Sequence, residues 1–202
     1  MARRALISVS NKTGLKMLLE TLAKHGFEII SSGGTARKIR ELGYEAAEIS
    51  TYTGYPESPD GLLKTLHPKI HGGLLLDPSR SQHREYMAAQ GIQPIDLLVV
   101  NLYPFEKTAA EKTALFREVV ENIDIGGPAM IRAAAKASLL HGTVTVVVEP
   151  EQYGEIAEEM EKTGGSISLE TKRKMAVKAF VKTAHYEVAI KNYLERWLTC
   201  QS

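Results

Sequence analysis

Ala5-Leu6-Ile7-Ser8-Val9, an apolar run followed by a polar loop and then a helical pattern, is the stretch that decides the fold. The leucines after the loop recur with helical spacing up to His25-Gly26: Leu15, Leu18, Leu19 and Leu22. The same order then repeats, because Phe27 to Ile30 is a second apolar run and Ala36 to Leu42 resumes the helical pattern. Such alternation is typical of a parallel sheet covered by helices.

Later segments extend this pattern. Two more apolar runs, Asp96 to Leu102 and Thr143 to Val148, predict further strands, and helical patterns cover about 151–162 and 168–197. The last helix has an apolar stripe that either covers the sheet or pairs with a partner chain, made of Val177, Val181, Ala184 and Val188. We therefore expect an α/β fold, a mostly parallel sheet flanked by helices, in one domain over 1–202, with the sheet core in 1–149 and extra C-terminal helices in 150–202.

The segment from Ser50 to Asp77 breaks the pattern. It contains closely spaced helix breakers, namely Gly54, Pro56, Pro59, Gly61, Pro68, Gly72 and Gly73. Long irregular segments often carry function, so no regular element is expected here. Ser79 with Gln82 predicts a capping box for a helix that ends near Gly91, and Pro128 is predicted to be the first residue of another helix.

Composition excludes several classes of protein. The 202 residues carry a net charge of +1, so no overall field attracts the chain to nucleic acid or to a membrane. The single cysteine, Cys200, excludes an internal disulfide framework. The sequence contains no apolar stretch long enough for a signal peptide or a spanning helix. These features predict a cytoplasmic protein with neither a nucleic-acid nor a membrane partner.

The loops after the first two strands are the first candidates for a ligand site, because ligands of parallel sheets bind at the carboxyl ends of the strands. Ser8 to Gly14 offers hydroxyls and a lysine, and Ser32-Gly33-Gly34-Thr35 lets backbone amides approach an anion. Both suit a phosphate monoester, although plain turns explain each loop as well. The glycine fingerprints of NAD and ATP sites are missing.

Three later segments add polar groups. His67 and His71 suggest a metal, but Pro68 interrupts the pattern and no third ligand has a known spacing, so no metal is expected. Asn101 to Phe105 follows a buried strand and is either a ligand loop or an aromatic lid. Asp124 precedes a predicted helix and is either a site residue or a plain N-cap. Lys136 lies among alanines and is either an acid or base with a shifted pKa or a solvated side chain.

Together these segments resemble the inosine monophosphate (IMP) cyclohydrolase domain of the bifunctional purine biosynthesis family. The motifs that carry the resemblance are 8–14, 32–35, 64–68, 101–105, 123–127, 132–136 and 178–186. The resemblance implies a fold like that of methylglyoxal synthase and a homodimer. It also implies nucleotide binding and the closure of 5-formamidoimidazole-4-carboxamide ribotide (FAICAR) to IMP with loss of water, without a cofactor. The family's transformylase, as a domain or a separate protein, is the expected functional partner and lies outside this chain.

The resemblance also implies roles for individual residues. Lys136 is the expected proton donor and acceptor, Asp124 and Tyr103 belong to its relay, and Lys64 stabilises the oxyanion with the amide of Ile125. The residues expected to bind substrate are Ser10, Asn11, Lys12, Ser32, Gly33, Gly34, Thr35, Leu62, Leu63, Thr65, Val100, Asn101, Ile125 and Gly126. Leu62 replaces an arginine found in many members, and Ala137-Ser138 replaces their asparagine-led pair.

Two other functions remain open from the sequence. A methylglyoxal synthase shares the expected fold and phosphate site, but the segment from Asp124 to Lys136 does not resemble it. A non-catalytic ligand-binding domain, such as the regulatory domain of carbamoyl phosphate synthetase, does not need Lys64, Tyr103, Asp124 and Lys136 together.

Overall fold

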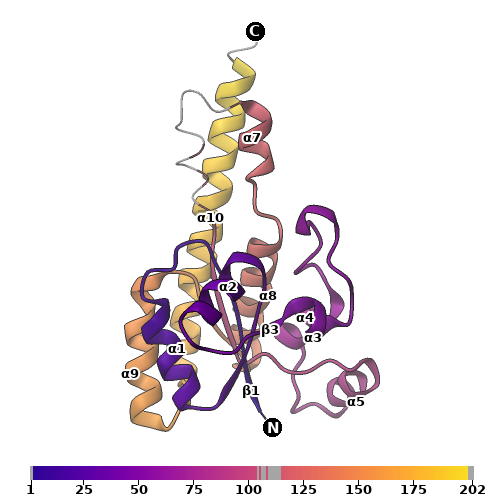
Figure 1. Cartoon of the computed structure of the whole chain (residues 1–202), viewed down its shortest axis with the longest axis vertical. Coiled ribbons are helices and arrows are strands. Elements are labelled where there is room, and N and C mark those ends of the chain that lie inside the picture. Colours follow the sequence, from indigo (N-terminus) through magenta and orange to yellow (C-terminus); the bar gives the residue numbers. More distant parts are fainter. Residues whose placement is uncertain (1, 104, 106–107, 109–114, 200–202) are drawn as a thin grey trace.

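A five-stranded sheet with the order β3-β2-β1-β4-β5 forms the centre of the computed structural model (Figure 1), which describes residues 2–103, 105, 108 and 115–199. All neighbouring strands are parallel. The strands are β1 (Arg3–Val9), β2 (Phe27–Ser31), β3 (Ala47–Glu48), β4 (Leu97–Asn101) and β5 (Thr145–Val147). The predicted α/β fold with a parallel sheet is therefore confirmed.

Helices cover both faces of this sheet. In chain order they are α1 (Leu15–Lys24), α2 (Gly33–Glu41), α3 (Ile49–Thr53), α4 (Pro68–Leu75), α5 (Ser81–Gln90), α7 (Phe116–Glu121), α8 (Gly126–His141), α9 (Tyr153–Thr163) and α10 (Leu169–Thr199), with 3-10 turns η1 (Pro59–Gly61) and η2 (Pro150–Gln152). Alternate strand residues face opposite layers, as a strand requires. Ala5 and Ile7 pack with residues of α1 and α9, whereas Leu6 packs with residues of α8 and α10.

The long helix α10 rises from the body of the molecule and carries α7 at its far end (Figure 1). Its 31 residues span about 46 Å. Phe116 of α7 stacks on Trp197, with 3.9 Å between ring centroids, and also on Tyr193. None of the helices in the described ranges is both long and apolar enough to cross a bilayer.

The predicted valine stripe of α10 does not cover the sheet. The buried face consists of Met175, Ala176, Ala179, Thr183, Tyr186 and Ile190. Val177, Val181 and Val188 are about half exposed and lie on the opposite side of the helix. The prediction that this stripe covers the sheet is therefore wrong, and its pairing with a partner chain stays a prediction.

The absence of regular structure predicted between Ser50 and Asp77 is also wrong. Pro68 begins α4, where a proline is well suited, and Nδ1 of His67 accepts a hydrogen bond from the backbone N–H of Lys69 at 3.1 Å. Gly72 and Gly73 lie inside α4 because the next segment packs against them. A Cβ on Gly73 would be 2.6 Å from the carbonyl oxygen of Gln93. These glycines serve tertiary packing and do not break the helix.

Two helix starts also differ from the prediction. Helix α5 begins at Ser81 with Arg80 as its N-cap, while the Ser79 hydroxyl donates to Asp77 Oδ1 at 2.7 Å, so no capping box forms. Helix α8 begins at Gly126, which makes Pro128 its third residue. In both places a loop contact that sequence spacing does not reveal sets the start of the helix.

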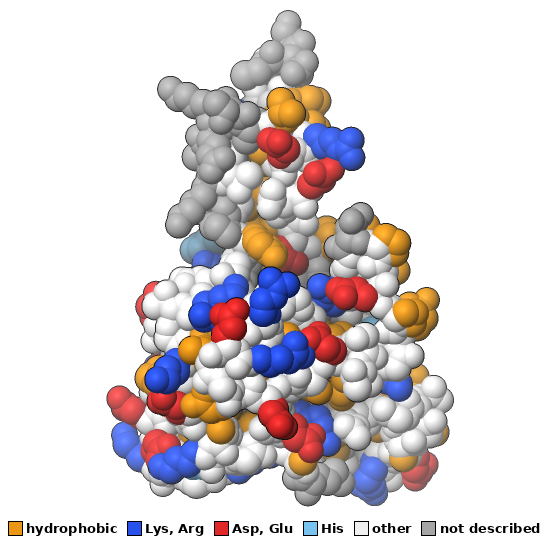
Figure 2. All heavy atoms as spheres, viewed as in Figure 1, with side chains coloured by type: hydrophobic (Ala, Val, Ile, Leu, Met, Phe, Trp, Pro, Cys, Tyr) orange, Lys and Arg blue, Asp and Glu red, His pale blue; other side chains and the backbone are white. Residues whose placement is uncertain are grey.

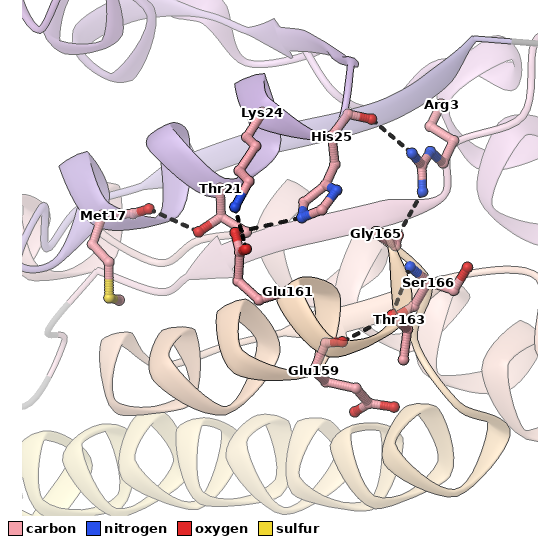
Figure 3. A network of polar contacts seen from close by, with 10 residues as sticks. All are labelled: Arg3, Met17, Thr21, Lys24, His25, Glu159, Glu161, Thr163, Gly165 and Ser166. Atoms are coloured by element: carbon pink, nitrogen blue, oxygen red, sulfur yellow. Dashed lines mark hydrogen bonds and ion pairs between the residues drawn. The ribbon is translucent and has the colours of Figure 1, made fainter.

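Polar contacts tie the amino end of β1 to α1 and α9 (Figure 3). The guanidinium of Arg3 donates to the carbonyl oxygens of Gly165 at 2.6 Å and His25 at 2.7 Å. Glu161 pairs with Lys24 and lies 3.5 Å from Nε2 of His25. This network fastens the end of the sheet opposite the loops that follow the strands.

Candidate functional site

Asn101, at the carboxyl end of β4, organises the loop that follows β1. Its Oδ1 accepts hydrogen bonds from the Ser10 N–H at 2.7 Å, the Ser10 hydroxyl at 3.0 Å and the Asn11 N–H at 2.8 Å. Its Nδ2 donates to the Asn11 carbonyl oxygen at 2.9 Å. With these bonds a buried side chain fixes the backbone of the loop. The Asn101 side chain therefore holds the backbone of this loop in place.

The loop after β2 leads into α2 with free backbone donors. Ser32 is the extended N-cap of α2, and its side chain makes no capping bond. Gly33 and Gly34 are exposed, so their N–H groups at the helix start are open to an anion. Thr35 is buried, and its hydroxyl accepts from the Val9 N–H at 3.1 Å and donates to the Val9 carbonyl oxygen at 3.0 Å. Thr35 thus ties α2 to β1.

Two side chains of the first loop also bond within the loop. Nζ of Lys12 donates to the carbonyl oxygens of Val9 and Ser10, both at 3.2 Å. Oδ1 of Asn11 accepts from the Thr13 N–H at 3.0 Å. The Lys12 ammonium is thereby held at the mouth of the loop, where it adds positive charge.

The segment before α4 brings Lys64 and Thr65 to two helix starts. Nζ of Lys64 pairs with Oε1 of Glu57 at 2.7 Å and lies 3.4 Å from the position of a Cβ on Gly33. The Thr65 hydroxyl occupies the place where a Cβ on Gly126 would lie. One short segment therefore connects the amino ends of α2 and α8.

Asp124 lies at the amino end of α8. Its Oδ1 accepts from the Gly127 N–H at 2.8 Å, and its own N–H donates to the Tyr186 hydroxyl at 2.8 Å. Burial raises the pKa of the Asp124 carboxyl above its usual value, while the Gly127 bond opposes this effect. Asp124 is thus both a cap and a carboxyl group that keeps its proton to higher pH than an exposed aspartate.

Apolar side chains surround these groups. Leu62, Leu63, Tyr103 and Ile125 are all more than half exposed. Tyr103 also lines a cleft of about 610 Å³, together with Ser10 and Asn11 and with Lys182 and His185 of α10. Val100, in contrast, is 2% exposed and its side chain packs in the core, so only its backbone is near the site.

Lys136 lies apart from the other predicted catalytic residues. It is an exposed residue in the middle of α8, ten residues after Gly126. Ten residues of helix correspond to about 15 Å along the axis. A lysine side chain does not span that distance, so Lys136 and Asp124 of one chain do not meet at the start of α8.

Two residues of the site were not among the predicted ones. Tyr186 belongs to a quoted motif, but nothing in its spacing indicates that its hydroxyl holds the backbone of Asp124. Glu57 has no sequence signal at all, because its partner Lys64 is seven residues away in an irregular segment. Among the described residues, no group of three His, Cys, Asp or Glu side chains is arranged to hold a metal ion.

Comparisons with known proteins match nearly the whole chain. A family model described as MGS-like domain matches residues 14–129, and one described as AICARFT/IMPCHase bienzyme matches residues 134–201. The bifunctional purine biosynthesis protein PurH of Bradyrhizobium diazoefficiens is 51% identical over 195 residues, which are 96% of this chain and 36% of that protein. PurH of Persephonella marina is 52% identical over 194 residues, 96% of this chain and 37% of that protein.

A solved structure is similar over its full length. The crystal structure of ForH has a TM-score of 0.83 at 29% identity and covers 96% of this chain and 100% of that chain. The chain spans about a third of the length of the PurH proteins it matches.

Proposed function

Because this chain belongs to the MGS-like domain family and its C-terminal region matches the AICARFT/IMPCHase bienzyme, we propose that it is an IMP cyclohydrolase. It closes FAICAR to IMP with loss of water. The observation that carries this proposal is the contact of Thr65 with Gly126, which brings the Lys64 segment to the helix start where Asp124 lies. The proposal places the cation, the carboxyl group and the free helix N–H groups around one substrate.

Substrate binding follows from the loops. The phosphate of the ribotide binds the N–H groups of Gly33 and Gly34 at the start of α2, beside the hydroxyl of Ser32. The backbone between Ser10 and Lys12, held by Asn101, supports the ribose side. The exposed apolar side chains of Leu62, Leu63 and Ile125 contact the heterocycle. This arrangement is a nucleotide-binding site.

Ring closure requires three events. The carboxamide nitrogen attacks the formyl carbon, the formyl oxygen gains negative charge, and the nitrogen loses a proton. The Lys64 ammonium and the N–H of Ile125 at the start of α8 stabilise this oxyanion. The oxygen then takes up two protons and leaves as water, while the formamide nitrogen loses its own proton and forms the C=N bond of the new ring. The raised pKa of Asp124 suits proton transfer at this step. Tyr103 orients the formamide from the other side.

Lys136 takes part from a second copy of the chain. Its place about 15 Å along α8 from the helix start supports this proposal, and it shares the outer face of α8 with the exposed Leu139 and Leu140. A two-fold dimer through this face and the valine stripe of α10 brings the Lys136 of each chain to the other chain's site. The transformylase reaction supplies the formyl group of the substrate, and the reaction takes place in the cytoplasm.

A mixed dimer tests this shared site. Lys136→Ala and Asp124→Asn chains with different affinity tags are co-expressed, and only the heterodimer is isolated. A shared site predicts about half the wild-type activity per dimer, because one of the two sites keeps both residues. Background activity in a folded heterodimer contradicts the shared site, and a monomeric wild type contradicts the dimer.

The direct test of the function follows IMP formation by absorbance when the purified chain is given FAICAR. Turnover above the spontaneous rate that falls about a hundredfold, but stays measurable, in Asp124→Asn and Lys64→Met supports the proposal. Lys38 lies on the same helix as Gly33 with a half-buried side chain, so Lys38→Met is the matched control and keeps full activity. A folded chain that only binds IMP supports the non-catalytic alternative, and release of phosphate from a triose phosphate supports methylglyoxal synthase.

A further inference from the structure

The ammonium of Lys64 occupies an unfavourable place. It lies 3.4 Å from the position of a Cβ on Gly33, the first residue of α2, where the unpaired N–H groups of the helix give a partial positive charge. A free lysine also gains rotamer entropy when it points into water. Without an opposing interaction, Lys64 is therefore expected to leave the amino end of α2.

Glu57 supplies that interaction. Its Oε1 lies 2.7 Å from Nζ of Lys64, and the Lys64 side chain is only 27% exposed whereas that of Glu57 is 54% exposed. The carboxylate therefore approaches from the solvent side and holds the cation against the protein. The pair borders a small cavity, about 30 Å³, that is also lined by Ser32, Ser58 and His67.

The backbone between the two residues is folded to bring them together. The N–H of Gly61 donates to the Ser58 carbonyl oxygen at 2.9 Å, and the N–H of Lys64 donates to the Gly61 carbonyl oxygen at 3.2 Å. The Ser58 hydroxyl accepts from the Leu63 N–H at 2.9 Å. Gly61 has a φ of 69°, and a Cβ there would lie 3.0 Å from Cε of Lys64 and 3.3 Å from Oε1 of Glu57. Two successive turns thus leave just enough room for the pair.

We propose that Glu57 is a positioning residue that holds the Lys64 ammonium at the amino end of α2 for the reaction. This inference rests on the proposed cyclohydrolase function. An ammonium has three N–H donors, and Glu57 engages it from one side, so donors remain for a ligand. The oxyanion develops only in the transition state, whereas the phosphate proposed at the start of α2 binds in the ground state, so loss of this positioning lowers kcat and also raises KM.

A double-mutant cycle tests whether Glu57 acts through Lys64. Glu57→Gln is expected to lower kcat about tenfold and to raise KM by a smaller factor. In the Lys64→Met background it causes no further loss, because the residue it positions is gone. The matched control is Glu41→Gln, which breaks the 3.1 Å pair of Glu41 with Lys38 on α2 and leaves kcat unchanged. A tenfold loss in both backgrounds, or an effect on KM alone, overturns the proposal.

A second measurement does not depend on activity. In the protein with ¹³Cε-labelled lysine, the signal missing from Lys64→Met identifies Lys64. A held side chain gives two resolved proton shifts on this carbon, which merge in Glu57→Gln but not in Glu41→Gln. One averaged shift in the wild type overturns the positioning role. If the wild type shows two shifts but does not convert FAICAR, the proposed function fails while the pairing stands.

Discussion

The hydroxyl of Thr65 fills the place where a Cβ on Gly126 would lie. A residue of the irregular segment before α4 is therefore in direct contact with the first residue of α8. Helix α8 packs in turn against α4 and α10. The contact brings the segment that contains Lys64 to the start of the helix that follows Asp124, although 60 residues separate Lys64 and Asp124 in the sequence.

Gly126→Ala tests this contact. The added methyl group forces Thr65 away, so we expect the unfolding free energy to fall by about 1–3 kcal/mol and kcat/KM to fall by about tenfold or more. Urea unfolding and the FAICAR assay measure the two effects. Gly154→Ala is the control, because nothing lies within 4 Å of its Cβ position in α9 and alanine favours a helix. Equal effects of the two substitutions would contradict the contact.

Asp124→Asn is expected to lower turnover and to become more stable relative to the wild type as pH rises. Burial raises the pKa of Asp124 in the folded state, so the folded protein disfavours the charged carboxylate. The stability that the neutral carboxyl provides is complete below the unfolded pKa of about 4 and is lost as pH rises through the folded pKa. Urea unfolding between pH 3 and pH 7 should therefore show that the unfolding free energy of the variant increases relative to that of the wild type as pH rises. The substitution should also lower turnover about a hundredfold.

Asp96 does not disturb that comparison. Burial raises its pKa too, but it is present in both proteins and cancels in the difference. A stability difference that stays constant with pH would show that Asp124 titrates as it does in the unfolded chain.

Asn101→Ala should damage the loop after β1. The substitution leaves the N–H groups of Ser10 and Asn11 without their acceptor, and we expect a loss of about 2–3 kcal/mol in unfolding free energy. Because the proposed function places the ribotide on this loop, KM for FAICAR should rise. Asn122→Ala is the comparison, since the side chain of Asn122 donates to the Glu118 carbonyl oxygen on the surface. If the KM values of both variants match the wild type, Asn101 does not support the binding loop.

The two neighbouring glycines after α9 separate backbone strain from steric clash. Gly164 and Gly165 have φ values of 73° and 93°, so alanine costs about 1–2 kcal/mol at either position. Only at Gly165 would a Cβ also collide, 2.6 Å from Nη1 of Arg3 and 2.9 Å from His25 (Figure 3). Gly165→Ala should therefore have a clearly lower melting temperature than Gly164→Ala. Equal melting temperatures would mean that Arg3 and His25 move aside without loss of stability.

The sequence predicted the sheet well because buried strands carry their signal locally. Ala5 to Val9 and Asp96 to Leu102 are mainly apolar runs, and β1 and β4 begin and end within two residues of these bounds. The two-residue strand β3 was not predicted. Neither α4 nor the start of α5 could be predicted. Gly72 and Gly73 have a low helix propensity, so their local sequence argues against a helix. Glycine fits both positions because Ile92 and Gln93 pack closely against them.

The position of the candidate site at one edge of the sheet could be predicted, but the hydrogen bonds within it could not. The loops that carry Ser10 and Ser32 lie at the same edge because parallel strands end there. Asp124 lies instead between α7 and α8, at the start of the helix that leads back to β5. Residue type did not distinguish groups open to a ligand from groups used inside the protein, such as Thr35 and Asn101. The separation of Lys136 from Asp124 follows only from the observed start of α8.

The mixed surface charge agrees with the neutral net charge. On the face seen in Figure 2, Lys and Arg side chains are interspersed with Asp and Glu side chains. A charged ligand is therefore attracted mainly by local groups, among them Lys12 and Lys64.

The central position of β1 has a consequence for the protein during its synthesis. One neighbour of the strand, β2, follows it closely in the sequence, but its other neighbour, β4, begins only at Leu97. Until then the nascent chain has an open strand edge and an uncovered apolar surface that includes Leu6 and Ile30. Translation of the long segment between β2 and β4 is thus the period in which a chaperone protects this protein most effectively from aggregation.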